Sequence, residues 1–361
     1  DEFVFRPGAA DQGPSHTAIR GRPELIDSEA YFFRACGAST ASEPPRAPRS
    51  RGGPPAPGPN DRVCSVFPPG MGLLALPFFL PFVLAGAPAL DLGMLLRVGH
   101  VAAAAIEVLA TLLLWAVLRR FVSERWALAL VLLYFLGTSV RTVSSQALWQ
   151  HAGVHLALMC ALWLVLIERK LPLWREALAG LVRGLGGGVR QTTVLLSLGI
   201  AGSRVPDHGE SLMRRCLAIL AAFGGAAAGL APLLVFGWIA FGSPLEQGYG
   251  AKPFDAPFLE GLAGLLVSPS RGLLVYEPWA LLALAALASA LARRGRVADR
   301  LAVLGVVWWL FLLLYATYAE WWGGRVFGPR FLDDLAPLLI VGLGWGISCG
   351  LLERRTARLF F

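Results

Sequence analysis

The stretch LGMLLRVGHVAAAAIEVLATLLLWAVL, residues 92–118, is an apolar block broken by few polar residues. As a helix it is long enough to cross a hydrocarbon core of about 30 Å. The 361-residue chain is 56% hydrophobic and 16% charged, and its apolar residues come in such blocks rather than in amphipathic stripes. This pattern excludes a soluble α/β enzyme, and a transmembrane β-barrel would show short alternating segments instead. Further blocks lie at about 126–142, 150–167, 216–241, 274–293, 300–318 and 331–352.

We therefore predict an all-α fold, a polytopic membrane helical bundle with about nine membrane segments, two of them short. The short segments belong to residues 176–203, where LVRGLGGGVRQ interrupts the apolar run. We expect two short helices that meet at Arg190.

The chain divides into four regions by composition. Residues 1–62 are rich in Pro, Gly, Ser and Arg, so we expect a disordered or aberrant outer-loop remnant. Residues 63–91 contain five prolines, four of them within 63–86, which predicts an interfacial helix near 67–86 rather than a straight span. Residues 92–352 form the predicted transmembrane domain, and 353–361 a cytoplasmic tail.

Basic residues gather in five clusters between the apolar blocks, and all five fall on one side if 176–203 crosses up and down. The positive-inside bias assigns that side to the cytoplasm. The loops at 63–91, Arg190, 242–273 and 319–330 then lie on the opposite face. Because the clusters orient a membrane protein, the net charge of +8 does not indicate a nucleic-acid partner. The clusters contain Arg119, Arg120 and Arg125; Arg169, Lys170 and Arg175; Arg204, Arg214 and Arg215; Arg293, Arg294, Arg296 and Arg300; and Arg354, Arg355 and Arg358.

The opposite face carries arginines near helix ends, where topology alone disfavours cations. The forked donors of a guanidinium match phosphate oxygens, so Arg190, Arg271 and Arg330 are candidates to bind a lipid phosphate. The alternative is that each side chain reaches to the lipid headgroups.

The stretch AEWWGGRVFGPRFLDDL, residues 319–335, combines flat aromatic surface with backbone flexibility and a cation at a helix start. We predict that it forms one wall of a pocket, although an aromatic belt at the membrane interface would also explain the tryptophans. Two carboxylates are expected to pair structurally with Arg330 one turn earlier in the helix. The wall residues are Trp321, Trp322, Gly323 and Gly324, and the carboxylates are Asp333 and Asp334.

Polar residues at two other outer positions complete the predicted donor site. In WQHAGVH, Gln150 and His151 are candidates for substrate binding, and His155 lies on the same helix face. In SPSRGLLVYEP, Tyr276 is the further candidate. No third ligand accompanies the histidines and the five cysteines show no CxxC spacing, so we predict neither a metal site nor a disulfide framework.

The order of FPPGMGLLALPFFL, SSQALWQHAG, GGVRQTTVLL, SPSRGLLVYEP and WWGGRVFGPRFLDDLAP resembles the C-type membrane glycosyltransferases, in the bacterial branch akin to protein O-mannosyltransferases and the aminoarabinose transferase. The likeness spans about residues 62–340. It implies a polytopic enzyme of the bacterial inner membrane that moves a sugar from a polyprenyl-phosphate donor to an acceptor on the non-cytoplasmic face. Membrane lipid and the lipid-linked donor would be its partners, and a divalent cation could assist.

In that family an acidic residue just after the first helix acts as base or orients the acceptor. We expect this residue upstream of Asp1, which leaves open whether the chain as given is active. Asp27 and Glu29, in LIDSEAYFF, are the remaining candidates. Two other functions stay open, a transporter or flippase of lipid-linked glycans and a non-catalytic membrane protein.

Overall fold

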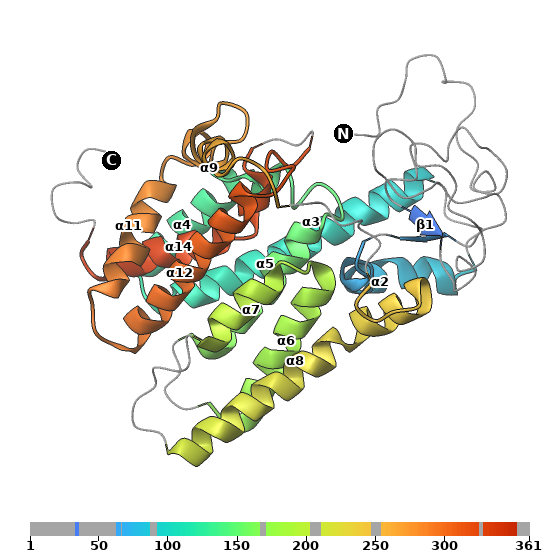
Figure 1. Cartoon of the computed structure of the whole chain (residues 1–361), viewed down its shortest axis with the longest axis horizontal. Helices are drawn as coiled ribbons and strands as arrows, with labels where there is room; N and C mark the ends of the chain where they lie inside the picture. The colour runs from blue at the N-terminus through green and yellow to red at the C-terminus, as the bar shows by residue number, and fades with distance from the viewer. Residues whose placement is uncertain are drawn as a thin grey trace.

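The computed structural model describes residues 33–35, 63–65, 67–86, 92–166, 171–202, 211–246, 254–324 and 328–351. In this part of the chain nearly every element is a helix (Figure 1). The elements are β1 (Phe33–Ala35), β2 (Val63–Ser65), α2 (Gly70–Leu84), α3 (Leu92–Leu118), α4 (Glu124–Leu136), η3 (Ser139–Arg141), α5 (Gln150–Val165), α6 (Leu173–Val189), α7 (Thr193–Gly202), α8 (Leu212–Phe241), α9 (Phe258–Val267), α10 (Leu273–Tyr276), α11 (Ala280–Leu291), α12 (Arg296–Ala316), α13 (Arg330–Asp333) and α14 (Ala336–Ser348).

The all-helical prediction is confirmed, but fewer helices than predicted are long enough to cross a membrane. Within the described residues three qualify by length and apolar composition: residues 93–118 of α3, α8 and α12. Helices α4, α5, α11 and α14 have 13, 16, 12 and 13 residues. At about 1.5 Å per residue they rise only about 18 to 24 Å. The apolar blocks exceed the helices because turns interrupt them, as at Glu277, which ends α10 before α11 begins.

The helices pack as one bundle around a shared apolar core. Helix α5 lies between α3 and α6, and α12 packs against α7, α9 and α11. Helix α14 closes the bundle against α11, α4 and α3, and its residues Ala336 to Gly346 are all buried. Figure 1 shows α8 along one edge, beside α6, and only a small part of its apolar length is covered by other helices.

Helices α6 and α8 approach each other along a seam of glycines. A Cβ atom on Gly225 of α8 would overlap the carbonyl oxygen of Ala177, and one on Gly184 of α6 would overlap that of Ala226. Gly180 and Gly229 are equally close to the facing backbone. Such small-xxx-small spacing lets two helix backbones touch, which drives helix association where lipid weakens the hydrophobic effect. The seam therefore fixes the position of α6, and with it the position of Arg190, which follows the last residue of α6.

The predicted break at Arg190 is confirmed, since α6 ends at Val189 and α7 begins at Thr193. The predicted helix near 67–86 is also present as α2, despite Pro77 and Pro81 inside it. The first residue of α2, Gly70, lies directly on the backbone of Gly188. The N-terminus of α2 and the C-terminus of α6 thus meet beside Arg190.

One expectation for the N-terminal part needs correction, and the expected outer-loop remnant at 1–62 stays a prediction. Within that remnant, Phe33–Ala35 pairs with Val63–Ser65 as an antiparallel strand. Cys64 is disulfide-bonded, contrary to the expectation from cysteine spacing, because the partner of a single disulfide can come from any distance along the chain. Apart from β1, the predicted region 1–62 lies outside the described residues, as do Asp27, Glu29 and the tail 353–361.

The glycine seam predicts a large difference between two neighbouring substitutions in α8. Gly225→Ala should lower the free energy of unfolding by about 1–3 kcal/mol, because its methyl group overlaps the α6 backbone. Gly224→Ala is the control, since a Cβ there meets nothing within 4 Å. Thermal unfolding of both variants in one detergent measures the difference. Equal midpoints would contradict the close approach of α6 and α8.

Candidate functional site

Arg190 lies at the break between α6 and α7 with an extended backbone, φ −150° and ψ 126°. Its amide donates to the Gly186 carbonyl at 2.9 Å. Its carbonyl accepts from the Thr193 amide at 3.0 Å and from the Thr193 hydroxyl at 2.6 Å. The end of α6 and the start of α7 are therefore joined through this residue, which fixes the direction of its side chain.

The Arg190 side chain is 11% exposed and makes polar and aromatic contacts. Its Nη1 lies 3.2 Å from Oδ2 of Asp334, and its Nη2 donates to the Tyr315 hydroxyl at 3.1 Å. The guanidinium carbon lies 5.6 Å from the centre of the Phe331 ring, which stacks on Tyr315 at 4.3 Å. A cation at the edge of an apolar bundle is thus held by a counter-ion, a hydroxyl and an aromatic face.

His151 completes this arrangement from α5. Its Nδ1 lies 2.7 Å from Oδ1 of Asp334, and because an ionised carboxylate only accepts, Nδ1 carries the proton. Arg190 Nη1 lies 3.0 Å from Nδ1 and 3.3 Å from Nε2 of the same ring. Since these distances are similar, the guanidinium lies against the face of the imidazole rather than in its plane. Asp334 is therefore shared between His151 and Arg190.

Asp333 is held separately by residues that follow α4. The Ser139 hydroxyl donates to Oδ1 at 2.6 Å and the Ser144 hydroxyl to Oδ2 at 2.5 Å. The backbone carbonyl of Asp333 lies 2.9 Å from Nε2 of His155. The adjacent acids therefore point to different partners, although both are fully buried.

The predicted pairing of Asp333 and Asp334 with Arg330 is not the pairing found. Arg330 Nη1 donates to the Gly323 carbonyl at 3.0 Å, and its guanidinium carbon lies 4.4 Å from the centre of the Trp149 ring. The helix expected to continue from Arg330 is only the four-residue α13, so the spacing of a longer helix does not apply.

The two tryptophans and the glycines after them form a turn beside these residues. Gly323 and Gly324 have φ of +71° and +77°, a conformation that favours glycine. Arg271 Nη2 donates to the Gly324 carbonyl at 2.6 Å. Trp321 packs against Gly264, where any side chain would overlap its ring, and Trp322 is 44% exposed. Arg271 and Arg330, both predicted to face a phosphate, each donate to this turn.

The remaining predicted residues lie close by in the fold but are not all joined. Gln150 is the first residue of α5 and is half-buried, one position before His151. The Tyr276 hydroxyl donates to the Pro269 carbonyl at 3.2 Å. The Tyr276 ring also lies near Gly328, where a Cβ would approach it at 3.8 Å.

Five residues of this polar interior were not among the predicted site residues. Glu107, Tyr134 and Tyr315 come from α3, α4 and α12, and Ser139 and Ser144 follow α4. A usable signal existed only for Glu107, a lone carboxylate inside an apolar block that has to find a partner. The tyrosines and serines have no local pattern that separates them from ordinary interior residues.

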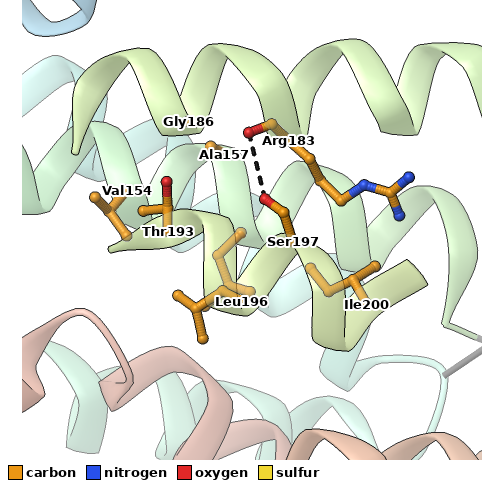
Figure 2. A pocket seen from close by; sticks show the side chains of 9 residues that line it. Val154, Ala157, Arg183, Gly186, Thr193, Leu196, Ser197 and Ile200 are labelled. Atoms are coloured by element: carbon orange, nitrogen blue, oxygen red, sulfur yellow. Dashed lines mark hydrogen bonds between the residues drawn. The ribbon is translucent and has the colours of Figure 1, made fainter. Parts of the chain in front are cut away.

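A small, partly open hollow with a volume of about 10 Å³ lies between α5, α6 and α7 (Figure 2). Gly186 and Thr193, which bond the backbone of Arg190, form part of its wall. The Ser197 hydroxyl donates to the Arg183 carbonyl at 3.4 Å, and Figure 2 shows the Arg183 guanidinium extending past Ser197. The other lining residues are Val154, Ala157, Leu158, Leu196 and Ile200, so the wall is mostly apolar.

Glu277 is a further buried carboxyl, in the turn between α10 and α11 and outside both helices. Neither of its oxygens has a hydrogen-bond partner of standard geometry among the described residues. Burial raises the pKa of Glu277 well above its ordinary value and the charge of Asp333 adds to this shift, while the Ser139 amide opposes it. Folding therefore favours the neutral form of the Glu277 carboxyl.

The chemistry available at this site is anion binding and hydrogen bonding. Within the described segments, no group of three or more His, Cys, Asp or Glu side chains is placed to hold a metal ion. No family model matches the sequence, and neither a curated protein nor a solved structure matches it.

The raised pKa of Glu277 predicts a specific pH dependence of stability. The unfolded chain releases this proton near pH 4.5, whereas the folded chain keeps it to a higher pH. Stability from this group is therefore present below the unfolded pKa and is lost as pH rises toward the folded pKa. Glu277→Gln should remove this loss and raise the unfolding midpoint more at about pH 8 than at about pH 5.

Unfolding midpoints at several pH values, measured for the variant and the wild type, test this expectation. Glu260→Gln is the matched control, because Glu260 is exposed at the start of α9. Parallel pH profiles for wild type and Glu277→Gln would contradict a raised pKa of Glu277.

Proposed function

We propose that the chain is a membrane glycosyltransferase that moves a sugar from a polyprenyl-phosphate donor to an acceptor on the non-cytoplasmic face. Arg190 binds the donor phosphate in this proposal. Three helices long and apolar enough to span a bilayer, joined by shorter apolar helices, support a polytopic membrane bundle. The resemblance of the outer loop motifs to C-type glycosyltransferases supports the reaction class.

The observation that carries the proposal is the position of Arg190. Its guanidinium is mostly buried, lies next to aromatic rings and contacts the carboxylate of Asp334 at 3.2 Å. The donor phosphate is a diester with one negative charge, and when its bond to the sugar breaks it leaves as a polyprenyl monophosphate with up to two charges, whose oxygens match the forked donors of a guanidinium. Arg190 would then support the charge that develops on the leaving phosphate.

The surroundings of Arg190 fit the two other parts of such a donor. The small, mostly apolar hollow between α5, α6 and α7 is lined by Gly186 and Thr193, which bond the backbone of Arg190, so apolar surface of the kind that contacts an isoprenoid chain lies near the site. Phe331 and the exposed Trp322 offer aromatic surface of the kind on which sugar rings pack. The family resemblance places the acceptor base just after the first helix of such enzymes, and the candidates Asp27 and Glu29 lie outside the described residues.

Two features support the proposed orientation in the membrane, the contacts of basic residues and the disulfide of Cys64. Basic residues contact helix ends at the side opposite Arg190, which supports a cytoplasmic location for that side. The disulfide of Cys64, just before α2, supports an oxidising compartment for the Arg190 side. The contacts are Arg120 to the Trp163 carbonyl, Arg214 to the Leu171 carbonyl, Arg300 to the Val165 and Leu166 carbonyls, and Arg293 over the Trp345 ring.

Substitution of Arg190 tests the proposal. The full chain in lipid nanodiscs is titrated with polyprenyl monophosphate, and the dissociation constant is measured. Arg190→Ala should weaken binding by about 10- to 100-fold, because a charge-assisted hydrogen bond is lost. Arg190→Lys keeps the charge beside Asp334 but loses the fork, so it should fold normally and still bind more weakly.

Arg119→Ala is the control, because Arg119 follows α3 on the opposite side and pairs with the exposed Glu124. Wild-type affinity in Arg190→Lys and Arg190→Ala would overturn the assignment of Arg190, and so would an equal loss in Arg119→Ala.

A further inference from the structure

Glu107, Tyr134 and His155 form a fully buried cluster contributed by α3, α4 and α5. The Tyr134 hydroxyl donates to Glu107 Oε1 at 2.6 Å. His155 Nδ1 lies 3.0 Å from Glu107 Oε2 and 3.0 Å from the same hydroxyl. The Tyr134 and His155 rings meet edge to face at 5.9 Å. None of the three side chains is on the exposed surface, so none can touch a ligand that approaches Arg190 from outside.

The hydrogen-bond geometry fixes where the protons lie. A backbone carbonyl only accepts, so His155 Nε2 carries a proton and donates it to Asp333. The tyrosine proton is committed to Glu107 Oε1. Without a further proton, the lone pairs of Nδ1 and Glu107 Oε2 would face each other at 3.0 Å. The contact between Glu107 and His155 therefore contains a bridging proton, and the pair is neutral as a whole.

The two histidines of α5 hold two adjacent residues of another segment. His155 bonds the carbonyl of Asp333 at 2.9 Å, and His151, four residues earlier, bonds the carboxylate of Asp334 at 2.7 Å. Two contacts one helical turn apart define both the position and the rotation of the 333–334 turn. Asp334 in turn contacts Arg190 at 3.2 Å. A continuous series of contacts therefore runs from Glu107 to Arg190.

A purely structural role does not require charged groups here. Buried ionic clusters are often replaced by apolar side chains without loss of stability, so they add little to stability by themselves. Such clusters instead fix orientation, because each of their hydrogen bonds forms only in a narrow range of geometries. The cluster lies where such direction is useful, next to the turn that carries the counter-ion of Arg190.

We propose that Glu107, Tyr134 and His155 are positioning residues that set the place of Arg190 through the 333–334 turn, so that phosphate binding depends on side chains that never touch the phosphate. This inference rests on the proposed function of Arg190 as the phosphate ligand. The proposed site then includes buried side chains of α3 and α4, behind the residues that contact the phosphate.

Tyr134→Phe is the sharpest variant, because it removes one hydroxyl and keeps the ring against His155. In nanodiscs titrated with polyprenyl monophosphate, it should weaken binding by about 3- to 10-fold. Leu114→Ala is the matched control, since Leu114 is fully buried in α3 and belongs to the apolar core. It should lower the unfolding midpoint by at least as much as Tyr134→Phe and leave the affinity unchanged.

A double-variant cycle separates positioning from general loosening. In an Arg190→Lys background, Tyr134→Phe should weaken binding by less than about twofold, because both changes act on the same contact. A full multiplicative effect in that background would overturn the inference. Unchanged affinity in Tyr134→Phe would also overturn it, and so would an affinity loss in Leu114→Ala that matches its loss of stability.

A second measurement does not depend on the ligand. In the full chain with ¹⁵N-labelled histidine, the His155 Nδ1 signal should report the proton shared with Glu107, and Glu107→Gln should leave Nδ1 without a proton. Tyr134→Phe should shift the His151 signals, whereas Leu114→Ala should not. If wild type binds no polyprenyl monophosphate, the proposed function fails, and these spectra still decide the inference. Unmoved His151 signals in Tyr134→Phe would overturn it.

Discussion

The contact between Arg190 and Asp334 is the interaction on which the polar interior depends. A guanidinium that is 11% exposed at the edge of an apolar bundle needs a counter-ion, because water does not solvate it fully. Asp334, fully buried, has the same need and satisfies it with Arg190 and His151. His151, His155 and Glu107 are connected to this pair, since each one orients a neighbour that is closer to it.

Backbone packing brings the partners of this contact together from distant parts of the chain. The glycine seam between α6 and α8 fixes α6, and Gly70 of α2 rests on the end of α6 just before Arg190. The short α13 and the turn after it bring Asp334 to the same place. A larger side chain at any of these glycines would push the helices apart and move Arg190 away from its counter-ion. The polar site therefore depends on close helix packing.

The sequence predicted features that depend on local composition and missed those that depend on contacts between distant residues. The break at Arg190 follows from a run of glycines, and the importance of His151 and of the residues from 319 to 335 follows from unusual polar types in an apolar chain. The partner of Asp334 could not be predicted, because Arg190 lies 144 positions away. Regular helix spacing pointed to Arg330 instead, and the helix proved too short for it. The lengths of the apolar blocks likewise predicted more membrane-spanning helices than the structure has in its described residues. Turns interrupt several blocks, and a short turn of apolar residues hardly changes the hydropathy of a block.

The unfolding free energies of Arg190→Leu, Asp334→Leu and the double variant, in one detergent, test the central contact most directly. Each single substitution leaves one charge buried without its partner, so the account predicts a loss of about 3–5 kcal/mol for each. The double variant removes both charges and should lose much less than the sum of the two. Small and additive losses would show that the two residues do not interact, and the account of the polar interior would be wrong.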